Sequence, residues 1–420
     1  MPVYTLDHKK SPLAALPARG LDPHNREVPD AAPGVHHPVF VLESHPVQYR
    51  VPVYQELARL KPGAFEVIYA SNCSVRGHRD AGFGVNVKWD VPLLEGYPNR
   101  VLNNEHGEPL RGFGSLHSRG LFPLIAKKRP AAVLFMQFAY AYDLGAYLSC
   151  LALRVPIWIR HETQDEAFAR SPFKSLLRNV AYRVAYRPVQ HAFFIGELNR
   201  RHLLNCGVPG DRMSRAPYCV PNPLGELPDA QKQTVRTQVR TRYGIAPDEC
   251  VVCFSGKLIP KKHPDLLLQA GERLKEEGMR SFCFLFLGSG ELEMELRRHA
   301  AALPFPVKFA GFVNQAELPA YYLAADVLVL PSRRMGETWG LVANEALHAG
   351  CAVAMSEAVG CAAEFGHFKR CRVFPAEDAE ACARAIMELS RFPRDFNWAA
   401  RRLEKYSVAT AARAIAAKLP

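Results

Sequence analysis

Two glutamates, Glu337 and Glu345, stand eight positions apart in the stretch "GETWGLVANEALHAG", residues 336–350. Eight helical residues rise about 12 Å and turn about 800°, which would leave both carboxylates on broadly the same side. The glycines that flank "ETW" favour a loop position for Glu337 and a helix that begins near Thr338 or Gly340. The pair could contact hydroxyl groups at two ends of a long ligand, or it could be two solvated charges on a surface helix.

Three lysines follow an earlier apolar run that ends at Gly256: Lys257, Lys261 and Lys262 in "VVCFSGKLIPKKH". Lysines at a strand end, close to the positive end of the next helix, form a site for phosphate or pyrophosphate; a solvated basic loop is the alternative. Carboxylates accept hydrogen bonds from hydroxyls and repel phosphates. A nucleoside diphosphate sugar, with two diols separated by a pyrophosphate, would suit one glutamate for each diol and a basic site between them.

Two further groups of polar residues follow apolar runs in the amino-terminal half. They could approach a phosphate or an acceptor. The alternative is ordinary loop structure, because Pro46 stiffens the first turn and a lone histidine is more often a satisfied polar group than a catalyst. The groups are Ser44, His45 and Gln48 in the first loop, and Arg160, His161 and Glu162 in the second.

Metal chemistry has little support in the sequence. No Asp-x-Asp triplet occurs, and a second cysteine pair that would complete a zinc site with Cys250 and Cys253 is missing. These two cysteines lie in "ECVVCFSG", which is typical of a buried strand. The eleven cysteines are irregularly spaced, which favours a reducing compartment over a disulfide framework. The "GSG" at 288–290 lacks the third glycine of a dinucleotide site and predicts a tight turn with close backbone approach.

Composition and charge narrow the possible partners. The chain has 420 residues, enough for two domains, and a formal net charge of +12. This charge favours nucleic acid, an anionic membrane surface or phosphorylated small molecules. Nucleic acid is not expected, because the basic residues are scattered and no nucleic-acid module is recognisable. No apolar signal segment opens the chain, and the most apolar region is broken by polar residues, so we expect a cytoplasmic protein that is soluble or at most peripheral on a membrane.

Short apolar runs alternate with longer helical patterns in both halves of the chain. This pattern predicts an α/β protein with two doubly wound parallel sheets that face each other across a cleft. Ligands should then bind at the carboxyl ends of the strands. The predicted strands lie in residues 39–44, 65–71, 131–137, 155–162 and 191–197 of the first half, and in 250–256, 282–290, 307–312, 326–332, 352–357 and 371–376 of the second.

The predicted organisation has five parts. A proline-rich and glycine-containing stretch separates the two patterned regions, as an interdomain linker would. The last segment is strongly helical, and its mix of basic and apolar residues leaves open a position on a membrane surface. The parts are a disordered tail at 1–37, a first domain at 38–216, a linker at 217–232, a second domain at 233–395 and a C-terminal helical segment at 396–420.

Several segments of the second half resemble the nucleotide-sugar domain of the retaining glycosyltransferases of family 4, which have the GT-B fold. These segments are "FSGKLIPKKHPDLLLQA", "FLGSGELE", "VKFAGFVNQAELPAYYLAADVLVLPS" and "GETWGLVANEALHAGCAVAMSEAVGCAAE". In the first half, "ESHPVQYRVPVYQELARL", "DAGFGVNVKWDVPLLEGY" and "IWIRHET" look like the acceptor-side domain of a bacterial subgroup of these enzymes. In the GT-B fold the last helix commonly packs back on the first domain, which we expect here from about residue 396.

The resemblance assigns roles to individual residues. The first glutamate of the family's E-x7-E motif, here Glu337, binds hydroxyls of the donor sugar, and the second, here Glu345, binds the ribose diol. The amides of Gly340 and Leu341 would contact phosphate. The donor site would also include Gly256 and Thr338.

Three positions depart from the family pattern. The basic pair near the pyrophosphate falls on Lys257 and Lys262, where the first is usually arginine, and His263 replaces the glycine that usually follows. A lysine contacts phosphate as a point charge and not as a bidentate fork. The sequence "RHE" stands where related enzymes often have "RGE" or "RGD", so His161 inherits no role directly.

The resemblance implies metal-independent transfer of a sugar, with retention, from a nucleotide-diphosphate sugar to an acceptor hydroxyl, in bacterial glycan, lipid or secondary-metabolite glycosylation. The acceptor could be a saccharide, a lipid-linked molecule or a small molecule, and no cofactor is expected. The alternatives are a non-catalytic nucleotide-sugar binder and a GT-B phosphorylase or epimerase. The candidate catalytic residues are Glu337, Lys262, Lys257 and His161.

Overall fold

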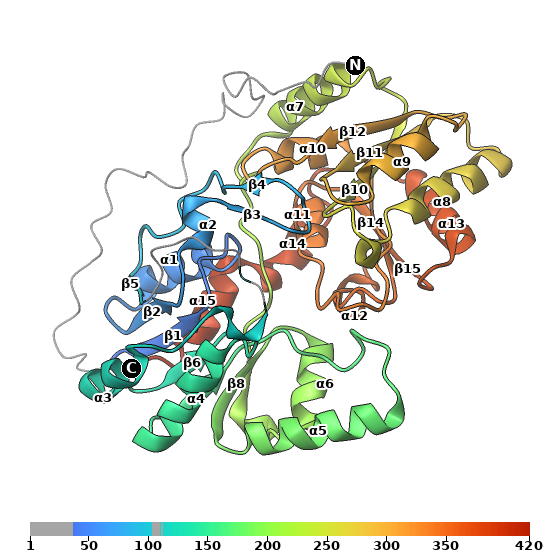
Figure 1. The fold of residues 1–420 in the computed structure, drawn as a ribbon. Helices are drawn as coiled ribbons and strands as arrows, with labels where there is room; N and C mark the ends of the chain where they lie inside the picture. Colours follow the sequence, from blue (N-terminus) through green and yellow to red (C-terminus); the bar gives the residue numbers. More distant parts are fainter. Residues whose placement is uncertain (1–36, 103–109, 111) are drawn as a thin grey trace.

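The computed structural model describes residues 37–102, 110 and 112–420 (Figure 1). Two β-sheets, of seven and six strands, form the centres of two α/β domains, and a small two-stranded sheet lies between them. This arrangement confirms the predicted fold class. The predicted tail, residues 1–37, lies outside the described residues except for His37.

The first sheet has the strand order β5-β2-β1-β6-β7-β8-β9, and all its neighbouring strands are parallel. In β1 (Val39–Glu43) successive side chains enter two different cores, with Val41 on one face and Leu42 on the other. Helices therefore cover both faces. The other strands are β2 (Phe65–Tyr69), β5 (Asn99–Val101), β6 (Val133–Phe135), β7 (Ile157–Ile159), β8 (Val189–Phe194) and β9 (Met213–Arg215), and the helices are α1 (Val51–Leu60), α2 (Cys73–Arg76), η2 (Phe113–Ser115), α3 (Leu121–Lys128), α4 (Ala141–Leu153), α5 (Pro172–Tyr186), α6 (Glu197–Asn205) and η3 (Gly210–Arg212).

The second sheet has the order β12-β11-β10-β13-β14-β15 and is also parallel throughout. Its central strand β10 (Cys250–Ser255) alternates in the same way, with Cys253 in one core and Phe254 in the other. The other elements are β11 (Phe282–Leu287), β12 (Val307–Gly311), β13 (Val327–Leu330), β14 (Ala352–Ser356), β15 (Cys371–Phe374), α7 (Asp229–Arg242), η4 (Pro260–Lys262), α8 (Asp265–Glu276), α9 (Glu293–Ala300), α10 (Leu318–Ala324), α11 (Val342–His348), α12 (Ala362–Phe365) and α13 (Ala379–Ser390).

Every predicted apolar run contains a strand, whereas the edge strands β5 and β9 and the hairpin strands were not predicted. The edge strands are three residues long and read "NRV" and "MSR", without an apolar run. Such short edge strands are held by backbone pairing with a neighbour, and a composition pattern does not reveal them. Cys250 and Cys253 lie in β10, as the buried-strand interpretation predicts.

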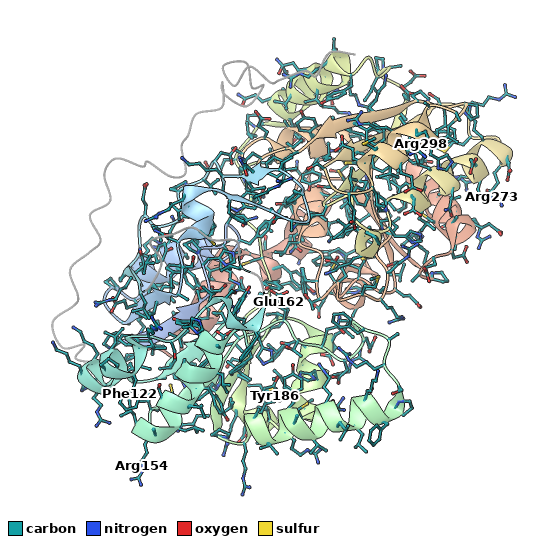
Figure 2. The ribbon with its side chains drawn as sticks, viewed as in Figure 1. Phe122, Arg154, Glu162, Tyr186, Arg273 and Arg298 are labelled. Carbon is teal, nitrogen blue, oxygen red and sulfur yellow. The ribbon has the colours of Figure 1, made fainter. Side chains whose placement is uncertain are left out.

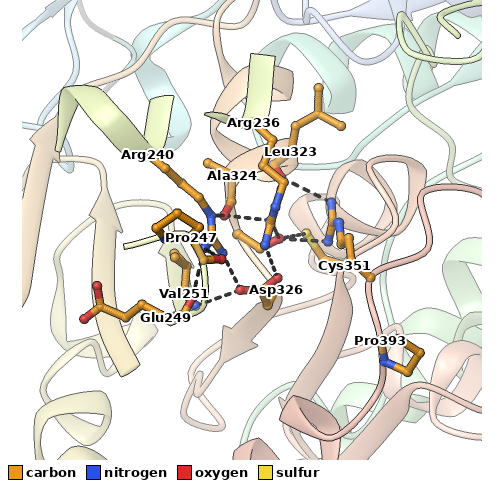
Figure 3. Close-up of polar contacts among 12 residues, drawn as sticks. Arg236, Arg240, Pro247, Glu249, Val251, Leu323, Ala324, Asp326, Cys351 and Pro393 are labelled. Atoms are coloured by element: carbon orange, nitrogen blue, oxygen red, sulfur yellow. Dashed lines mark hydrogen bonds and ion pairs between the residues drawn. The ribbon is translucent and has the colours of Figure 1, made fainter. Parts of the chain in front are cut away.

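A buried ion-pair cluster fixes α7 to the second sheet (Figure 3). Arg236 and Arg240 each bind one carboxylate oxygen of Asp326 at 2.6 Å. The same carboxylate accepts a hydrogen bond from the backbone N–H of Val251 at 2.8 Å, which ties it to the start of β10. Within the predicted linker, 217–232, residues 217–228 form turns and extended chain, and residues 229–232 already belong to α7. The domain limits themselves stay predictions.

Residues 78–90 of the first domain form an arm that reaches the second domain (Figure 1). Its two short strands, β3 (His78–Arg79) and β4 (Asn86–Val87), pair with each other in an antiparallel ladder. The Phe83 ring packs edge-on against Phe312, with ring centroids 5.0 Å apart. The Phe83 carbonyl accepts a hydrogen bond from the Ser289 hydroxyl at 2.8 Å. The arm therefore covers the strand ends of the second sheet.

The C-terminal segment contacts both domains. Its first helix, α14 (Ala400–Leu403), packs on α11 of the second domain, the turn η5 (Glu404–Tyr406) follows, and α15 (Val408–Ala416) packs on α1 of the first domain (Figure 1). Ala411, Ala412 and Ile415 are buried in the same core as β1. The membrane-surface alternative for this segment is therefore wrong, because α1 already covers its apolar face. In the part of the chain that the structure describes, no helix is long and apolar enough to cross a membrane.

Candidate functional site

Glu337 lies in the loop after β13 and forms an ion pair with Lys262 of η4. The Lys262 ammonium is 2.5 Å from Oε2 of Glu337, whose side chain is 8% exposed. The Ser332 hydroxyl donates to the same oxygen at 3.3 Å. Burial alone would raise the pKa of Glu337, but the charges of Lys262 and Lys261 outweigh it and hold that pKa below its usual value. Glu337 is therefore an anion at neutral pH.

Lys261 holds the same loop through a hydrogen bond to the backbone of the loop. Its ammonium donates to the carbonyl oxygen of Gly336 at 2.7 Å. Burial lowers the pKa of Lys261, and the neighbouring charge of Glu337 opposes that shift. Because Lys261 and Lys262 are adjacent in one tight turn, two cations approach the loop of Glu337 from the end of β10.

Glu345 lies in α11, with its carboxylate shared by three hydrogen-bond donors. Gln315 donates to Oε1 at 2.7 Å, and the Tyr322 hydroxyl donates to Oε2 at 2.9 Å. The third donor is the hydroxyl of Tyr49, which comes from the first domain. Burial raises the pKa of Glu345 despite these hydrogen bonds. Among the described residues, no cation compensates this carboxylate as Lys262 compensates Glu337.

Gly340 and Leu341 precede α11, which begins at Val342, later than predicted. The delay has a backbone cause: Gly340 has φ +97°, which is incompatible with a right-handed helix. A Cβ at this position would also lie 2.9 Å from a methyl carbon of Val359. Within the described residues, the backbone N–H groups of Gly340 and Leu341 donate to no protein acceptor. They remain able to bind a ligand anion.

Glycines let the ends of β10 and β11 approach each other closely. A Cβ on Gly288 would lie 1.9 Å from the carbonyl oxygen of Gly256, and one on Gly290 would lie 2.4 Å from that of Leu258. This confirms the predicted tight turn with close backbone approach. The contact fixes the start of the loop that carries the lysines.

Lys257 is paired with a carboxylate of the arm. Its ammonium lies 2.7 and 2.9 Å from the two carboxylate oxygens of Asp80 and 5.0 Å from the centroid of the Phe83 ring. Burial alone would raise the pKa of Asp80, but the hydrogen bond from Lys257 contributes to lowering it. Asp80 thus neutralises a cation that the sequence assigns to a phosphate.

Glu162 follows β7 and connects the two domains (Figure 2). Its Oε2 accepts a hydrogen bond from the Thr338 hydroxyl at 2.6 Å. Its Oε1 accepts from the Tyr218 hydroxyl and lies 3.2 Å from the Arg50 guanidinium. Arg50 also forms a 2.5 Å ion pair with the buried Glu43 at the end of β1. Thr338 is therefore held by the first domain next to Glu337.

The loop after β1 reaches the site through Tyr49. The side chain of Gln48 is hydrogen bonded to the Tyr49 hydroxyl, which in turn contacts Glu345. Ser44 is buried, and its hydroxyl lies 2.9 Å from Nδ1 of His45. Burial, together with the nearby charge of Arg50, lowers the pKa of His45 to about 4. His45 is therefore neutral at physiological pH.

Arg160 and His161 direct their polar groups into the first domain. Arg160 is buried and donates to the carbonyl oxygens of Ala216 and Pro217 at 3.3 and 2.9 Å. Nε2 of His161 lies 2.9 Å from the Tyr186 hydroxyl, which is 3.2 Å from His202. Burial lowers the pKa of His161 to about 3. Both residues shape the loop that presents Glu162.

The structure thus brings Gln48 and Tyr49 after β1, Glu162 after β7, the lysines after β10 and Glu337 after β13 into the region where the two domains meet, whereas Arg160 and His161 point into the first domain. Sequence reasoning missed several contacts there, because they depend on how the domains meet. Tyr49 could have been found as the neighbour of Gln48, whereas nothing in "RDAGFG" indicates that Asp80 pairs with a lysine of the other domain. The missed residues are Tyr49, Arg50, Asp80, Tyr218, Gln315, Tyr322 and Ser332. Among the described residues, no group of three or more His, Cys, Asp or Glu side chains could hold a metal ion.

A comparison of the sequence with models of known protein families shows which family shares the segments that carry this site. The family of glycosyl transferases group 1 matches residues 235–406, which include the lysine turn and both glutamates. This part of the second domain therefore matches the group 1 glycosyl transferases. This confirms the resemblance that the E-x7-E stretch indicates for the second half of the chain.

Curated relatives of this group 1 domain share part of their length with the chain. The D-inositol 3-phosphate glycosyltransferase of Streptomyces coelicolor is 35% identical over 187 residues, which are 41% of this chain and 40% of that protein. A GDP-mannose-dependent alpha-(1-6)-phosphatidylinositol monomannoside mannosyltransferase of Mycobacterium tuberculosis is 30% identical over 161 residues, covering 37% of this chain and 41% of that protein. The chain therefore spans about two fifths of the length of these relatives.

Solved structures match nearly the whole chain. Anabaena Alr3699/HepE, solved in complex with UDP and glucose, has a TM-score of 0.62 at 16% identity, covering 91% of this chain and 99% of its own. WaaG, a glycosyltransferase involved in lipopolysaccharide biosynthesis, has a TM-score of 0.56 at 14% identity, covering 91% and 99%. This likeness shows the fold and confirms that the first domain and the group 1 domain together form the predicted GT-B architecture.

Proposed function

We propose that the protein is a retaining glycosyltransferase that moves a sugar from a nucleoside diphosphate sugar to an acceptor hydroxyl without a metal ion. The observation that carries the proposal is the pairing of Glu337 with Lys262 beside the hydrogen-bonded Glu345, at the strand ends of a group 1 domain. The two carboxylates differ in their surroundings, which suits two different hydroxyl-bearing parts of one donor.

Separate residues would bind the ribose, the diphosphate and the sugar of the donor. Glu345 accepts the ribose hydroxyls in place of donors such as Tyr49, whose contact crosses the two domains. The free N–H groups of Gly340 and Leu341 receive the diphosphate. Glu337, held as an anion by Lys262, accepts hydroxyls of the transferred sugar.

Charge stabilisation is assigned to Lys257 and Lys262. When the bond between the anomeric carbon and the diphosphate breaks, negative charge grows on the leaving phosphate oxygens. Preorganised cations in a site partly closed to water stabilise that charge more in the transition state than in the ground state. Glu162, which reaches Thr338 from the first domain, is assigned to the acceptor side.

The similar proteins suggest which donors and acceptors to test first. Alr3699/HepE is solved with UDP and glucose, and the Mycobacterium tuberculosis relative is named as GDP-mannose-dependent, so UDP- and GDP-sugars come first. The names of both curated relatives contain an inositol-based acceptor, one of them a phosphatidylinositol mannoside. We therefore propose a polyol acceptor, either free or attached to a lipid.

A donor panel tests the proposal directly. Thermal stabilisation of the full chain by UDP-, GDP- and ADP-sugars identifies the base, and transfer or hydrolysis of the radiolabelled donor shows turnover, including in the presence of EDTA. Stabilisation without any turnover would favour a non-catalytic nucleotide-sugar binder. Sugar release that requires inorganic phosphate would favour a phosphorylase. The Glu337→Gln variant is the matched control for turnover.

A further inference from the structure

Helix α5 carries its apolar residues on the side that faces solvent. Five large apolar side chains recur at spacings of three and four residues, so they form one stripe along the helix. A soluble helix normally buries such a stripe. Here the exposed fractions are 68% for Phe173, 60% for Leu176, 54% for Leu177, 53% for Val180 and 69% for Val184.

The side of α5 that packs on the domain is formed by aromatic and polar residues, with Tyr186 in a hydrophobic core and Tyr182 against it. Arg178 forms a 2.6 Å ion pair with Asp165 and lies 4.7 Å from the centroid of the Tyr182 ring. The Tyr186 hydroxyl joins His161 and His202, and Nδ1 of His202 lies 2.7 Å from Asp165. Since this network holds the helix in place, the apolar stripe is not required for attachment to the domain.

The charged residues of the segment that contains the stripe are all basic. Residues 167–196 contain no Asp or Glu and five basic residues. Three of these, Lys174, Arg183 and Arg187, are exposed on or beside α5. An apolar stripe with basic side chains beside it is the composition of a helix that lies in the interface of an anionic bilayer.

Helix α4 extends the apolar surface. The Tyr147 hydroxyl of α4 donates to the carbonyl oxygen of Ala185 in α5 at 2.8 Å, so the two helices are neighbours. Both helices lie along the lower edge of the first domain in the view of Figure 1, and Arg154, at the end of α4, projects outward there (Figure 2). The exposed apolar residues of α4 are Leu144, Leu148 and Leu151.

We propose that α5, with α4 beside it, docks this protein on an anionic lipid surface. The basic charge of this surface distinguishes between two candidate partners, a second copy of the chain and an anionic lipid surface. A second copy placed on the same face would bring basic side chains against basic side chains, which repel. Lipid phosphates are complementary to the basic residues, and the acyl boundary accepts the apolar stripe. The inference concerns attachment and stands independently of the proposed sugar transfer.

Attachment at α5 would also orient the site. The residues just before α5 touch the loop that carries Glu337, because the N–H of Gly336 donates to the carbonyl oxygen of Ala167 at 2.8 Å. Phe168 and Met335 form a backbone bridge there. If the proposed transferase activity holds, an acceptor attached to a lipid would approach the cleft from this side.

Vesicle co-sedimentation of the full chain tests the docking. Vesicles of phosphatidylcholine alone are compared with vesicles that also contain phosphatidylglycerol, at low and high salt. We expect binding only to the anionic vesicles, and weaker binding at high salt. The doubly substituted variant Leu177→Gln with Val180→Gln should bind at least about tenfold more weakly, since it removes apolar area from the stripe. Lys174→Glu with Arg183→Glu should have a similar effect.

The matched control is Met294→Gln, which alters an 80% exposed apolar residue of α9 in the other domain. It should bind vesicles as the unaltered chain does. Nucleotide-induced thermal stabilisation of the α5 variants should remain unchanged, which shows that they fold and separates this proposal from the donor site. Equal binding to both vesicle types, or no binding, overturns the proposal. So does a dimer in lipid-free solution that the α5 substitutions dissociate.

Discussion

At the scale of single residues, Glu337 and Glu345 are carboxylates of one motif with opposite electrostatic surroundings. The pKa of Glu337 is held below its usual value because Lys262 and Lys261 outweigh burial. The pKa of Glu345 is raised by burial, since only neutral groups hydrogen bond to it. Glu337 is therefore ionised without any ligand. The ionised form of Glu345 would be stabilised more than that of Glu337 by hydrogen-bond donors of a ligand.

The Glu345→Gln variant should stabilise the ligand-free protein at neutral pH. A carboxyl whose pKa is raised on folding stabilises the folded state below its usual pKa and loses that contribution as pH rises through the raised value. Thermal melts should therefore show the variant above the unaltered chain near pH 7, with the difference shrinking toward pH 4. Calorimetry should show about tenfold weaker binding of nucleoside diphosphates. Unchanged nucleotide affinity would remove Glu345 from the ribose site.

The Lys262→Met variant should be destabilised by about 1–3 kcal/mol, because it leaves the buried Glu337 without its cation. Adding Glu337→Gln should restore part of the loss. Because the pKa of Glu337 is lowered on folding, its ionised form stabilises the folded state above its usual pKa, and this contribution is lost as pH falls through the lowered value. The difference in unfolding free energy between Lys262→Met and the unaltered chain should therefore shrink in acid. Urea unfolding over a pH series measures this. An effect independent of pH would show that the ion pair is not its cause.

Replacing Glu337 should lower the turnover rate more than it weakens donor binding. Glu337→Gln keeps the shape of the side chain and removes its charge, so we expect donor affinity to change little and kcat to fall by about 10²-fold, in the range of other preorganised polar groups. Steady-state kinetics with the donor found in the panel measures both quantities. Full activity in this variant would contradict the sugar-binding role.

At the scale of elements, the arm at residues 78–90 places Asp80 on a lysine that the proposed donor needs. Both oxygens of Asp80 contact Lys257, and the arm is held further by Ser289 and by Asn314, whose amide donates to the Lys88 carbonyl at 2.8 Å. A diphosphate and the Asp80 carboxylate are both anions and would compete for the same ammonium. The proposed donor binding would therefore be coupled to the position of this arm.

The Asp80→Asn variant should bind nucleoside diphosphates several-fold more tightly, because Lys257 no longer has a competing carboxylate. Calorimetry with UDP and GDP measures the change. Asp90→Asn is the control: Asp90 attaches the same arm through the N–H of Ala316 but does not contact the lysine. If both variants tightened binding equally, the cause would be loosening of the arm and not removal of the competing charge.

At the scale of the whole molecule, the C-terminal segment and the contacts between the domains fix how the domains meet. The segment begins on α11 and ends on α1. Between the domains, Thr338 donates to Glu162, and Tyr49 is hydrogen bonded to Glu345. These two hydrogen bonds join residues that are more than a hundred positions apart in the chain. The site therefore depends on the relative placement of both domains.

The Ile415→Ala variant should destabilise the protein by about 2–5 kcal/mol, the usual range for truncating a buried aliphatic side chain. Chemical unfolding measures the loss. Ala417→Ser, at an exposed position near the end of the same helix, should have no measurable effect. An equal stability for Ile415→Ala would show that α15 does not hold the first domain.

Local residue patterns were enough to predict the central strands of both parallel sheets, because these strands bury apolar side chains on both faces and so appear as continuous apolar runs; the edge strands β5 and β9, which lack such a run, were not predicted. They also pointed to Glu337, Glu345 and the lysine turn as candidates, since strand-end loops lie close to their own strands in the chain, but the roles of these residues came from the family resemblance and stay predictions. Tertiary structure alone decided that Asp80 occupies Lys257, that Tyr49 reaches Glu345 and that α5 presents its apolar stripe to solvent. A helix pattern shows that one face is apolar, but which face is buried depends on what the rest of the fold places against it.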